Sequence, residues 1–418
     1  MSIIEIIRKK QQKEELTKSE IEYFVTNYTK GEIADYQAAA LIMAIYLNGM
    51  TNEEITNLTI AMANSGETLD LSSLGTVIDK HSTGGVGDKV TLILMPVVAA
   101  LGIPVAKMSG RGLGFTGGTV DKLESIKGYK TNLSIEEMIQ NVKKVGISLI
   151  SQTANLAPAD KKLYALRDVT SCTDSIPLIA SSIMSKKIAA GANKIVLDVT
   201  YGSGAFMKTK EDAEKLAETM KQIGELANRE TICIITDMDQ PLGYSIGNSL
   251  EVIEAIEALK GNMKKDVKHV VLTLGAEMLK LAGKGEDISK NEEMILQVIK
   301  NGKALEKFKQ LVQNQGGDVS YIENTEMFGK AKYIVPVYSP ISKNKINKLN
   351  AEIIGRASCM LGAGREKKDD KIDMAAGIVL NRKKGDELKK GDILAYIHTN
   401  RKDKIEEAEK QIILAYTN

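Results

Sequence analysis

Two glycine-rich segments carry the residue types that best suit the binding of a phosphate-like anion. One spans residues 79–88 and contains Lys80, His81 and Ser82; the other spans residues 109–124 and contains five glycines, an arginine and three hydroxyl side chains. Glycines leave room for several backbone N–H groups to converge on one anion. Each segment precedes a predicted helix, whose N-terminus adds unsatisfied donors and the positive end of its dipole. Together they predict a substrate that carries or uses phosphate.

Several side chains around these segments could add charge or hydroxyl groups to the anion site. They are Lys80, Ser82, Thr91, Ser109 and Thr119. The hydroxyls could equally cap helices, and both roles are compatible because a helix cap faces the place where an anion would bind. His81 is one of three histidines, and we predict that it donates a hydrogen bond or a proton. His269 and His398 lack such neighbours and are expected to be structural.

A second group of candidates falls on two predicted helices, over residues 159–169 and 175–190. Its members are Tyr164, Arg167, Ile179, Ser182 and Lys186. The first two lie three residues apart and the last two lie four apart, so each pair shares one helix face. A ring, an apolar side chain and several N–H donors suit a planar heterocycle with carbonyl acceptors. The same spacing also fits a surface ion pair or a lysine stem lying on apolar surface.

Alternating strands and helices must position the two glycine-rich segments. Short apolar runs predict strands at 77–78, 103–108, 146–150, 195–199 and 232–236. Strands separated by helices predict a mostly parallel sheet covered on both faces. Since the carboxyl ends of parallel strands meet at one edge, both glycine-rich segments are expected to face one pocket.

The N-terminal part predicts helices only. Helices are expected from Ser19 to Gly31 and over 35–47, and Thr51 and Glu54 form the capping box of a third. The two helices of the second group are long enough to leave the sheet and pack on this part. The predicted fold class is therefore α/β plus all-α, with a discontinuous helical domain hinged to a large mixed or parallel-sheet α/β domain and a small C-terminal α+β unit.

The predicted domains have the following limits. The helical domain takes residues 1–66 and 159–190, the α/β domain 70–155 and 194–334, and the C-terminal unit 335–418. Residues 267–314 predict further helices with a charged, solvated face. The C-terminal unit contains short β-like runs at 333–338, 351–357, 375–381 and 393–398.

The composition excludes several classes of protein. The chain has 418 residues, 43% of them hydrophobic and 26% charged, and its formal net charge is +2. Aromatic residues make up only 4% and there is no basic tract, which disfavours nucleic-acid binding. No apolar run reaches membrane-spanning length, and the widely spaced Cys172, Cys233 and Cys359 predict reduced thiols. We therefore expect a cytoplasmic protein without a nucleic-acid or membrane partner.

At this point the segments resemble one known family over essentially the whole chain. The matching segments are residues 80–88, 107–114, 116–124, 159–168, 175–187, 202–207, 237–248 and 361–365. They resemble the thymidine and pyrimidine-nucleoside phosphorylase family. The resemblance implies reversible phosphorolysis of uridine, thymidine and deoxyuridine to the free base and (deoxy)ribose 1-phosphate. It implies inorganic phosphate as co-substrate, no organic cofactor, and a homodimer formed through the helical domains.

The resemblance also assigns roles to individual residues. Phosphate would be held by Lys80, Ser82, Thr91, Lys107, Met108, Ser109 and Thr119. The nucleoside would be held by His81, Tyr164, Arg167, Ile179, Ser182 and Lys186. Arg167 and Lys186 would stabilise negative charge that develops on the leaving base, while His81 would contact the base and ribose and could donate a proton. These three are the expected catalytic residues.

Three positions refine or qualify the resemblance. Lys107 stands where family members restricted to deoxyribonucleosides carry Met, and an ammonium can reach a 2′-hydroxyl, so both uridine and thymidine are expected substrates. Phe115 replaces the usual His, so no proton transfer is assigned there. Lys89 stands where broad-specificity bacterial enzymes have Thr beside a potassium site.

The candidate potassium site leaves two possibilities open. Its implied members are Gly87, Lys89, Leu242, Ser245 and Glu254. A potassium ion stays if position 89 contributes only its carbonyl. Alternatively, the Lys89 ammonium fills the site and pairs with Glu254.

Two other functions compete with phosphorolysis. A phosphoribosyltransferase of the anthranilate type shares the architecture, but it needs an acidic magnesium site for pyrophosphate that the sequence does not display. A noncatalytic nucleoside-binding protein would keep the glycine-rich segments without needing the combination of His81, Arg167 and Lys186.

Overall fold

The computed structural model describes residues 1–112, 115, 117–365, 367 and 370–417. The chain divides into two compact units, and each is described by itself. Unit 1 comprises Met1–His81, Gln152–Val199 and Glu211–Ile235, and unit 2 comprises Ser82–Ser151, Thr200–Lys210 and Thr236–Asn418. The three-part division expected from the sequence stays a prediction.

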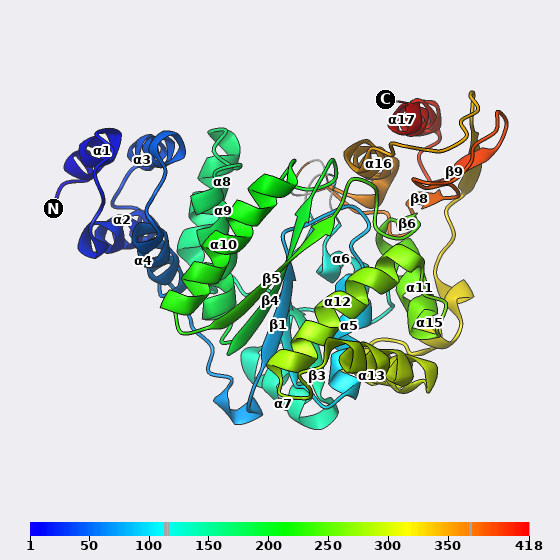
Figure 1. The fold of residues 1–418 in the computed structure, drawn as a ribbon, viewed down its shortest axis with the longest axis horizontal. Coiled ribbons are helices and arrows are strands. Elements are labelled where there is room, and N and C mark those ends of the chain that lie inside the picture. Colours follow the sequence, from blue (N-terminus) through cyan, green and yellow to red (C-terminus); the bar gives the residue numbers. More distant parts are fainter. Residues whose placement is uncertain (113–114, 116, 366, 368–369, 418) are drawn as a thin grey trace. The chain divides into compact units, whose positions relative to one another are not determined.

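Unit 1 is mainly helical. Its helices are α1 (Ile3–Gln11), α2 (Lys18–Lys30), α3 (Asp35–Asn48), α4 (Asn52–Ala63), α8 (Pro158–Val169), α9 (Ile176–Ala189) and α10 (Lys210–Leu226), with a 3-10 turn η1 (Ser72–Leu74). Helices α1–α4 lie beside α8 and α9 (Figure 1), although about a hundred residues of chain separate the two groups. The packing of these two groups within one unit agrees with the helical domain expected from two separate stretches of sequence.

Local signals explain where these helices begin and end. Thr17 and Thr51 form capping boxes with Glu20 and Glu54, and Gly31 ends α2 in a left-handed conformation. The apolar faces meet in a core that includes Phe24, Ile42, Leu58, Leu163 and Leu178. Burial of these faces, rather than helix propensity, supplies most of the stability of such short helices.

Strands β1 (Ile78–Ser82), β4 (Lys194–Tyr201) and β5 (Glu230–Asp237) form one sheet in the order β1-β4-β5. Strands β2 (Val105–Ser109) and β3 (Ile147–Ser151) form a second, parallel pair. All five strands coincide with strands predicted from apolar runs. The strands reach further than those runs because polar residues such as Lys80 and Ser109 continue the extended backbone.

Helices in unit 2 surround the strongly apolar α5 (Val90–Ala100). The others are α6 (Thr119–Leu123), α7 (Ile135–Val145), α11 (Asn248–Leu259), α12 (Lys265–Leu281), α13 (Ile288–Lys300), α14 (Lys303–Asn314) and α15 (Ser320–Glu323), with the turn η2 (Thr325–Met327). Helix α5 contacts α11–α14 and is buried around almost its whole circumference. A helix that is apolar on all sides belongs in a core, and α5 thereby fixes the glycine-rich segment that precedes it.

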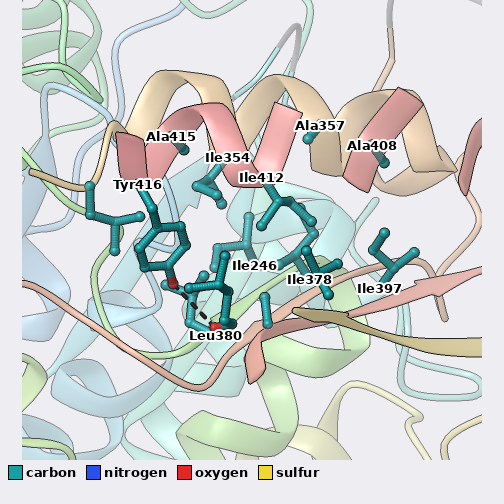
Figure 2. Packing of buried hydrophobic residues seen from close by; sticks show 14 of the residues in the cluster. Ile246, Ile354, Ala357, Ile378, Leu380, Ile397, Ala408, Ile412, Ala415 and Tyr416 are labelled. Carbon is teal, nitrogen blue, oxygen red and sulfur yellow. Dashed lines mark hydrogen bonds between the residues drawn. The ribbon is translucent and has the colours of Figure 1, made fainter. Parts of the chain in front are cut away.

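The C-terminal part of unit 2 joins a small antiparallel sheet to two helices. Strands β6 (Ser245–Ile246), β8 (Gly377–Leu380), β9 (Ile393–Thr399) and β7 (Tyr333–Tyr338) pair in that order, beside α16 (Ala351–Ser358), α17 (Ile405–Thr417) and the turns η3 (Cys359–Ala363) and η4 (Lys402–Lys404). Figure 2 shows Ile354 and Ile412 from the helices packed toward Ile378 and Ile397 from the sheet. The Tyr416 hydroxyl donates to the carbonyl of Leu394 at 3.2 Å.

One expected strand is wrong. Residues 351–357 form helix α16, because the side chain of Asn350 accepts a hydrogen bond from the backbone N–H of Ile353 and caps a helix start. The short apolar run has no length or turn signal that separates a strand from a buried helix. The neighbouring predictions of β7, β8 and β9 are confirmed. Among the described residues, no helix combines the length and hydropathy needed to cross a membrane.

Candidate functional site

The first glycine-rich segment connects β1 to α5. In unit 2, Gly84 and Gly87 adopt positive φ angles of 111° and 76°. The backbone N–H of Gly84 donates to the Ser82 hydroxyl at 3.2 Å, and the Thr83 and Thr200 hydroxyls lie 3.0 Å apart. The left-handed turns need glycine, and the hydroxyl contacts fix the path of the segment. This is a suitable geometry for presenting backbone donors to an anion.

The second glycine-rich segment follows β2. Lys107, Met108 and Ser109 end that strand and are all buried, while Thr119 begins α6. Thr91 lies in the first turn of α5 and is also buried. The sequence-predicted phosphate residues of unit 2 therefore sit at a strand end and at two helix starts. Residues 113, 114 and 116, which belong to the predicted segment, lie outside the described residues.

A buried carboxylate organises this second segment. Asp121 is fully buried and accepts hydrogen bonds from the backbone N–H of Gly112 at 2.7 Å and from Arg111 Nη1 at 3.1 Å. Arg365, from the C-terminal part, donates to both carboxylate oxygens at 2.8 and 3.0 Å. The fork geometry is typical of strong arginine–carboxylate pairs. Sequence reasoning included Arg365 only as part of the family resemblance and did not identify its contact with Asp121.

The phosphate-binding candidate Lys80 and the catalytic candidate His81 lie in β1, in unit 1. Lys80 is fully buried, with Nζ 3.4 Å from Asp198 Oδ2 on β4, and His81 is half-buried. Asp79 is paired at 2.6 Å with Lys187 from α9. These ion pairs compensate charges that are costly to bury alone. The role of Lys80 as a phosphate ligand stays a prediction.

The nucleoside-binding candidates lie on α8 and α9 in unit 1. Lys186 Nζ donates to Asp160 Oδ2 at 2.6 Å and to the Ser182 hydroxyl at 3.0 Å. The Tyr164 ring is 39% exposed, and Ile179 is buried. The sequence-predicted pair of Ser182 and Lys186 is thus in direct contact. Asp160 was not among the predicted site residues, although its spacing of four residues before Tyr164 could have marked it.

Arg167 joins the same region from α8. It is 3% exposed, and its guanidinium lies 5.6 Å from the Tyr164 ring. The three guanidinium nitrogens donate to the carbonyls of Cys172, Thr173 and Leu178 at 2.8–3.0 Å. Burial lowers the pKa of Arg167. Three of its five N–H groups therefore hold the α8–α9 connection, and among the contacts of the described residues the other two remain available to a ligand.

The candidate potassium site contains the Lys89 ammonium. Lys89 Nζ donates to the carbonyls of Leu242 and Ser245 at 2.7 and 3.0 Å, and to Glu254 Oε2 at 2.9 Å. Burial raises the pKa of Glu254, but Lys89 and the backbone N–H groups of Tyr244 and Ser245 more than offset this and hold it below its ordinary value. The residues present do not fit a bound potassium ion, because the Lys89 ammonium already occupies the place among the oxygens that the ion would take.

Phe115 also has a defined contact. Its ring lies 5.2 Å from the guanidinium of Arg356 on α16. A cation facing an aromatic ring at this distance is attracted by the ring quadrupole. The Phe115 ring therefore has a defined packing partner.

The predicted groups fall into different units. The helix-borne nucleoside residues and Lys80 and His81 belong to unit 1, whereas the other phosphate-binding candidates and the Lys89 site belong to unit 2. Within the described ranges, no cluster of three or more His, Cys, Asp or Glu side chains could hold a metal ion.

Comparisons with known proteins cover nearly the whole chain. Three family descriptions match: "Glycosyl transferase family, helical bundle domain" at residues 4–66, "Glycosyl transferase family, a/b domain" at 74–305, and "Pyrimidine nucleoside phosphorylase C-terminal domain" at 345–417. A pyrimidine-nucleoside phosphorylase of Staphylococcus haemolyticus is 54% identical over 404 residues, covering 96% of this chain and 93% of the relative. That of Bacillus subtilis is 52% identical over 419 residues, covering 100% and 96%.

A solved structure supports the same architecture. Anthranilate phosphoribosyltransferase from Thermus thermophilus matches with a TM-score of 0.61 at 18% sequence identity, over 76% of this chain and 99% of that one. This likeness concerns the fold. Together with the helical-bundle and a/b matches, it confirms the predicted class of a helical domain joined to an α/β domain with a C-terminal unit.

Proposed function

Because the chain belongs to the pyrimidine-nucleoside phosphorylase family, we propose that it catalyses the reversible phosphorolysis of uridine, thymidine and deoxyuridine. The products are the free base and ribose or deoxyribose 1-phosphate. The observation that carries this proposal is the identity of 52–54% with two such enzymes over almost the entire chain. The predicted anion segments and the cationic face on α8 and α9 are the chemistry that this reaction needs.

The proposed reaction is a displacement at C1′ of the sugar. A phosphate oxygen forms a bond to C1′ as the bond between C1′ and the base nitrogen breaks, and the bonding electrons leave with the base. The base then takes up a proton to become neutral uracil or thymine. The glycine-rich segments, with Ser82, Thr91, Ser109 and Thr119, would hold the phosphate through N–H and O–H donors.

The cations on α8 and α9 would stabilise the leaving base. Lys186 and Arg167 would donate to charge that grows only as the glycosidic bond breaks, and such an arrangement lowers a barrier. The side chains that line the space around the ring of the base would be those of Tyr164, Ile179 and Ser182. His81 would contact the base and ribose and supply the proton, since imidazole is a common general acid.

Two finer features belong to the same proposal. Lys107, buried in β2, would bind phosphate together with Met108 and would donate a hydrogen bond to a ribose 2′-hydroxyl. We propose a homodimer formed by an exposed apolar stripe on α3, where Tyr36, Met43 and Leu47 are 78%, 37% and 71% exposed. Their spacing places them along one side of the helix. A change of Leu47→Glu should shift the mass in light scattering from dimer to monomer.

The competing functions have less support. The likeness to anthranilate phosphoribosyltransferase is one of fold at 18% identity. A noncatalytic binding protein would not need donors matched to a leaving group. Cytoplasmic location is the expectation for a nucleoside-salvage enzyme of this family.

The decisive experiment measures base release by absorbance from uridine, thymidine and deoxyuridine, with and without inorganic phosphate. We expect release only when phosphate is present, together with formation of the sugar 1-phosphate. A preparation of the Lys186→Met variant controls for contaminating activity. Absence of base release with phosphate, or equal release without it, would refute the proposal; product from anthranilate and phosphoribosyl pyrophosphate would favour the rival.

A further inference from the structure

A second buried lysine holds the segment to which Lys89 binds. Lys383, which follows β8 in the C-terminal part, donates through Nζ to the carbonyls of Pro241 and Gly243 at 2.6 and 2.9 Å. It is also paired with Asp266 at the start of α12. With the carbonyls bound by Lys89, four of the five carbonyl groups of residues 241–245 accept a hydrogen bond from a lysine ammonium. We name residues 241–245 the carbonyl segment.

The charges around the carbonyl segment balance. Lys89 and Lys383 provide two positive charges, and Glu254 and Asp266 provide two negative ones. Both ammoniums are buried, with residue exposures of 0% and 5%. A buried charge without a counter-charge is costly. An added monovalent cation would bring a third positive charge into a cluster of two carboxylates, so the balance itself disfavours it.

The space is filled as well. Gly243 has a φ of 71°, and a Cβ built on it would lie 2.6 Å from Lys89 Nζ and 2.5 Å from Glu254 Oε1. The backbone N–H of Gly243 donates to Asp266 Oδ2 at 2.9 Å. The lysine ammonium and the carboxylates thus close on the backbone so tightly that a methyl group would not fit between them.

The carbonyl segment in turn touches the first glycine-rich segment. The backbone N–H of Leu242 donates to the carbonyl of Val86 at 2.9 Å, and a Cβ on Gly87 would lie 2.6 Å from the Leu242 carbonyl oxygen. Movement of the carbonyl segment would therefore move Val86 and Gly87. Through this contact the two lysines act on the geometry of a predicted phosphate-binding turn without touching phosphate.

We propose that Lys89 and Lys383 are built-in cations that replace a bound potassium ion and act as positioning residues for phosphate binding. The protein consequently works equally well whatever monovalent cation is in solution. The catalytic part of this inference rests on the proposed phosphorolysis. The structural part, that the carbonyl segment needs no external cation, stands independently of any reaction.

The first test compares salts on the unchanged protein. Phosphorolysis and the thermal unfolding midpoint are measured in potassium, sodium and tetramethylammonium chloride at one ionic strength. We expect rates within about twofold of one another, because nonspecific screening is the same in all three, and an equal midpoint in all three salts. A loss of about tenfold in tetramethylammonium, or a higher midpoint specific to potassium, would overturn the inference while leaving phosphorolysis in potassium intact.

The second test opens the site. Lys89→Thr removes the ammonium and leaves space and a hydroxyl among the same oxygens. In tetramethylammonium we expect its midpoint to fall by about 5 °C or more, because Glu254 is left without its buried partner. Potassium should bind the Lys89→Thr variant, restore its unfolding midpoint and raise its rate of phosphorolysis about tenfold over the rate in tetramethylammonium. Lys89→Met fills the space without charge, so its unfolding midpoint should fall and potassium should not restore it. If potassium restored the midpoints of both variants, or of neither, the proposal would be contradicted.

The third test separates positioning from general stability. In Lys383→Met we expect the KM for phosphate to rise about fivefold with the KM for uridine nearly unchanged, because the carbonyl segment contacts the predicted phosphate-binding turn at Val86 and Gly87. Lys260→Met removes an exposed lysine paired with Glu257 and is the matched control, expected to change neither constant. Equal changes in both KM values would overturn the positioning role. If no phosphorolysis occurs in any salt, the proposed function fails, while the midpoints of the first two tests still decide the structural part.

Discussion

Lys186 in unit 1 and Lys89 in unit 2 differ in how many of their donors the protein itself uses. An ammonium has three N–H groups. Lys89 directs all three to Leu242, Ser245 and Glu254, whereas Lys186 directs two to Asp160 and Ser182 and is 22% exposed at its side chain. Among the described residues, Lys186 thus keeps one donor for a ligand. A lysine held by a carboxylate and a hydroxyl is oriented and can still donate to a ligand. A lysine whose three N–H groups all donate to the protein can only stabilise the fold.

The two arginines make the same number of hydrogen bonds but differ in their partners. Arg167 uses three of its five N–H groups on backbone carbonyls, and Arg365 spends its contacts on Asp121 and Gly112. Arg167 therefore combines a local structural role with spare donors, in keeping with its predicted contact to the base. Arg365 belongs with Lys89 and Lys383, as a residue that holds a segment in place.

The largest effect should come from the charged groups that hold the fold. Asp121→Asn leaves Arg365 and Arg111 without their buried carboxylate, and we expect a loss of about 3–5 kcal/mol in the free energy of unfolding. Urea unfolding followed by circular dichroism measures this. Glu124→Gln, which alters a more exposed partner of Arg111, is the control and should cost much less. Equal losses of unfolding free energy in the two variants would show that the greater burial of Asp121 does not make it more important for stability than Glu124.

Removal of a donor on the binding side should reduce catalysis instead of stability. For Lys186→Met we expect kcat to fall about 10²–10³-fold, the usual cost of one donor that stabilises developing charge. Steady-state kinetics should show it, with unfolding changed far less than in Asp121→Asn. Lys161→Met, an exposed lysine on the same pair of helices, should be near wild type. A kcat that stays within threefold would remove Lys186 from the mechanism.

A smaller effect is expected on substrate choice. Lys107→Met removes the ammonium proposed to donate to a ribose 2′-hydroxyl, so kcat/KM for uridine should fall about tenfold more than for thymidine, since one lost hydrogen bond is worth about that factor. The ratio of the two constants is the measurement, and it cancels any shared loss in phosphate binding. An unchanged ratio would place the selection of ribose elsewhere.

The smallest effect concerns pH. The pKa values of Glu254 and Asp266 lie below their ordinary values of 4.5 and 3.8 because Lys89, Lys383 and backbone N–H groups outweigh the opposing effect of burial. A lowered folded-state pKa contributes stability that is present above the unfolded pKa and is lost as the pH falls through the folded value. Unfolding free energies measured downward from pH 6 should therefore decline below pH 5, and less steeply in Glu254→Gln. An identical slope in that variant would contradict the assignment.

Local signals predicted much of the fold. The signals that predicted correctly depend on neighbouring residues only. They are the Thr51–Glu54 capping box, the helix end at Gly31 and the apolar runs that form β2 and β3. Helix α16 was missed because its start depends on an asparagine cap beside a short apolar run. The two-residue strand β6 is defined only by its partner β8 and has no signal of its own.

The site was predicted unevenly for a related reason. The pair of Ser182 and Lys186 follows from helix spacing, and its contact is present. The sequence did not reveal that Lys383 holds the carbonyl segment or that Arg365 holds the second glycine-rich segment, because their partners lie more than a hundred residues away in sequence. Contacts of that kind depend on the tertiary fold and not on periodicity. Lys383 and Arg365 share one feature, a charged side chain that binds a turn distant in sequence, and only the structure reveals it.

Lys383 and Arg365 also set an order of events during synthesis. Both reside in the final quarter of the polypeptide, yet they brace turns that emerge from the ribosome more than a hundred residues earlier. The predicted anion-binding turns of a nascent chain must wait for synthesis of this C-terminal part before they acquire their final supports. Premature termination between β7 and Lys383 would therefore yield a product that lacks Lys383, although every predicted substrate-binding residue is present.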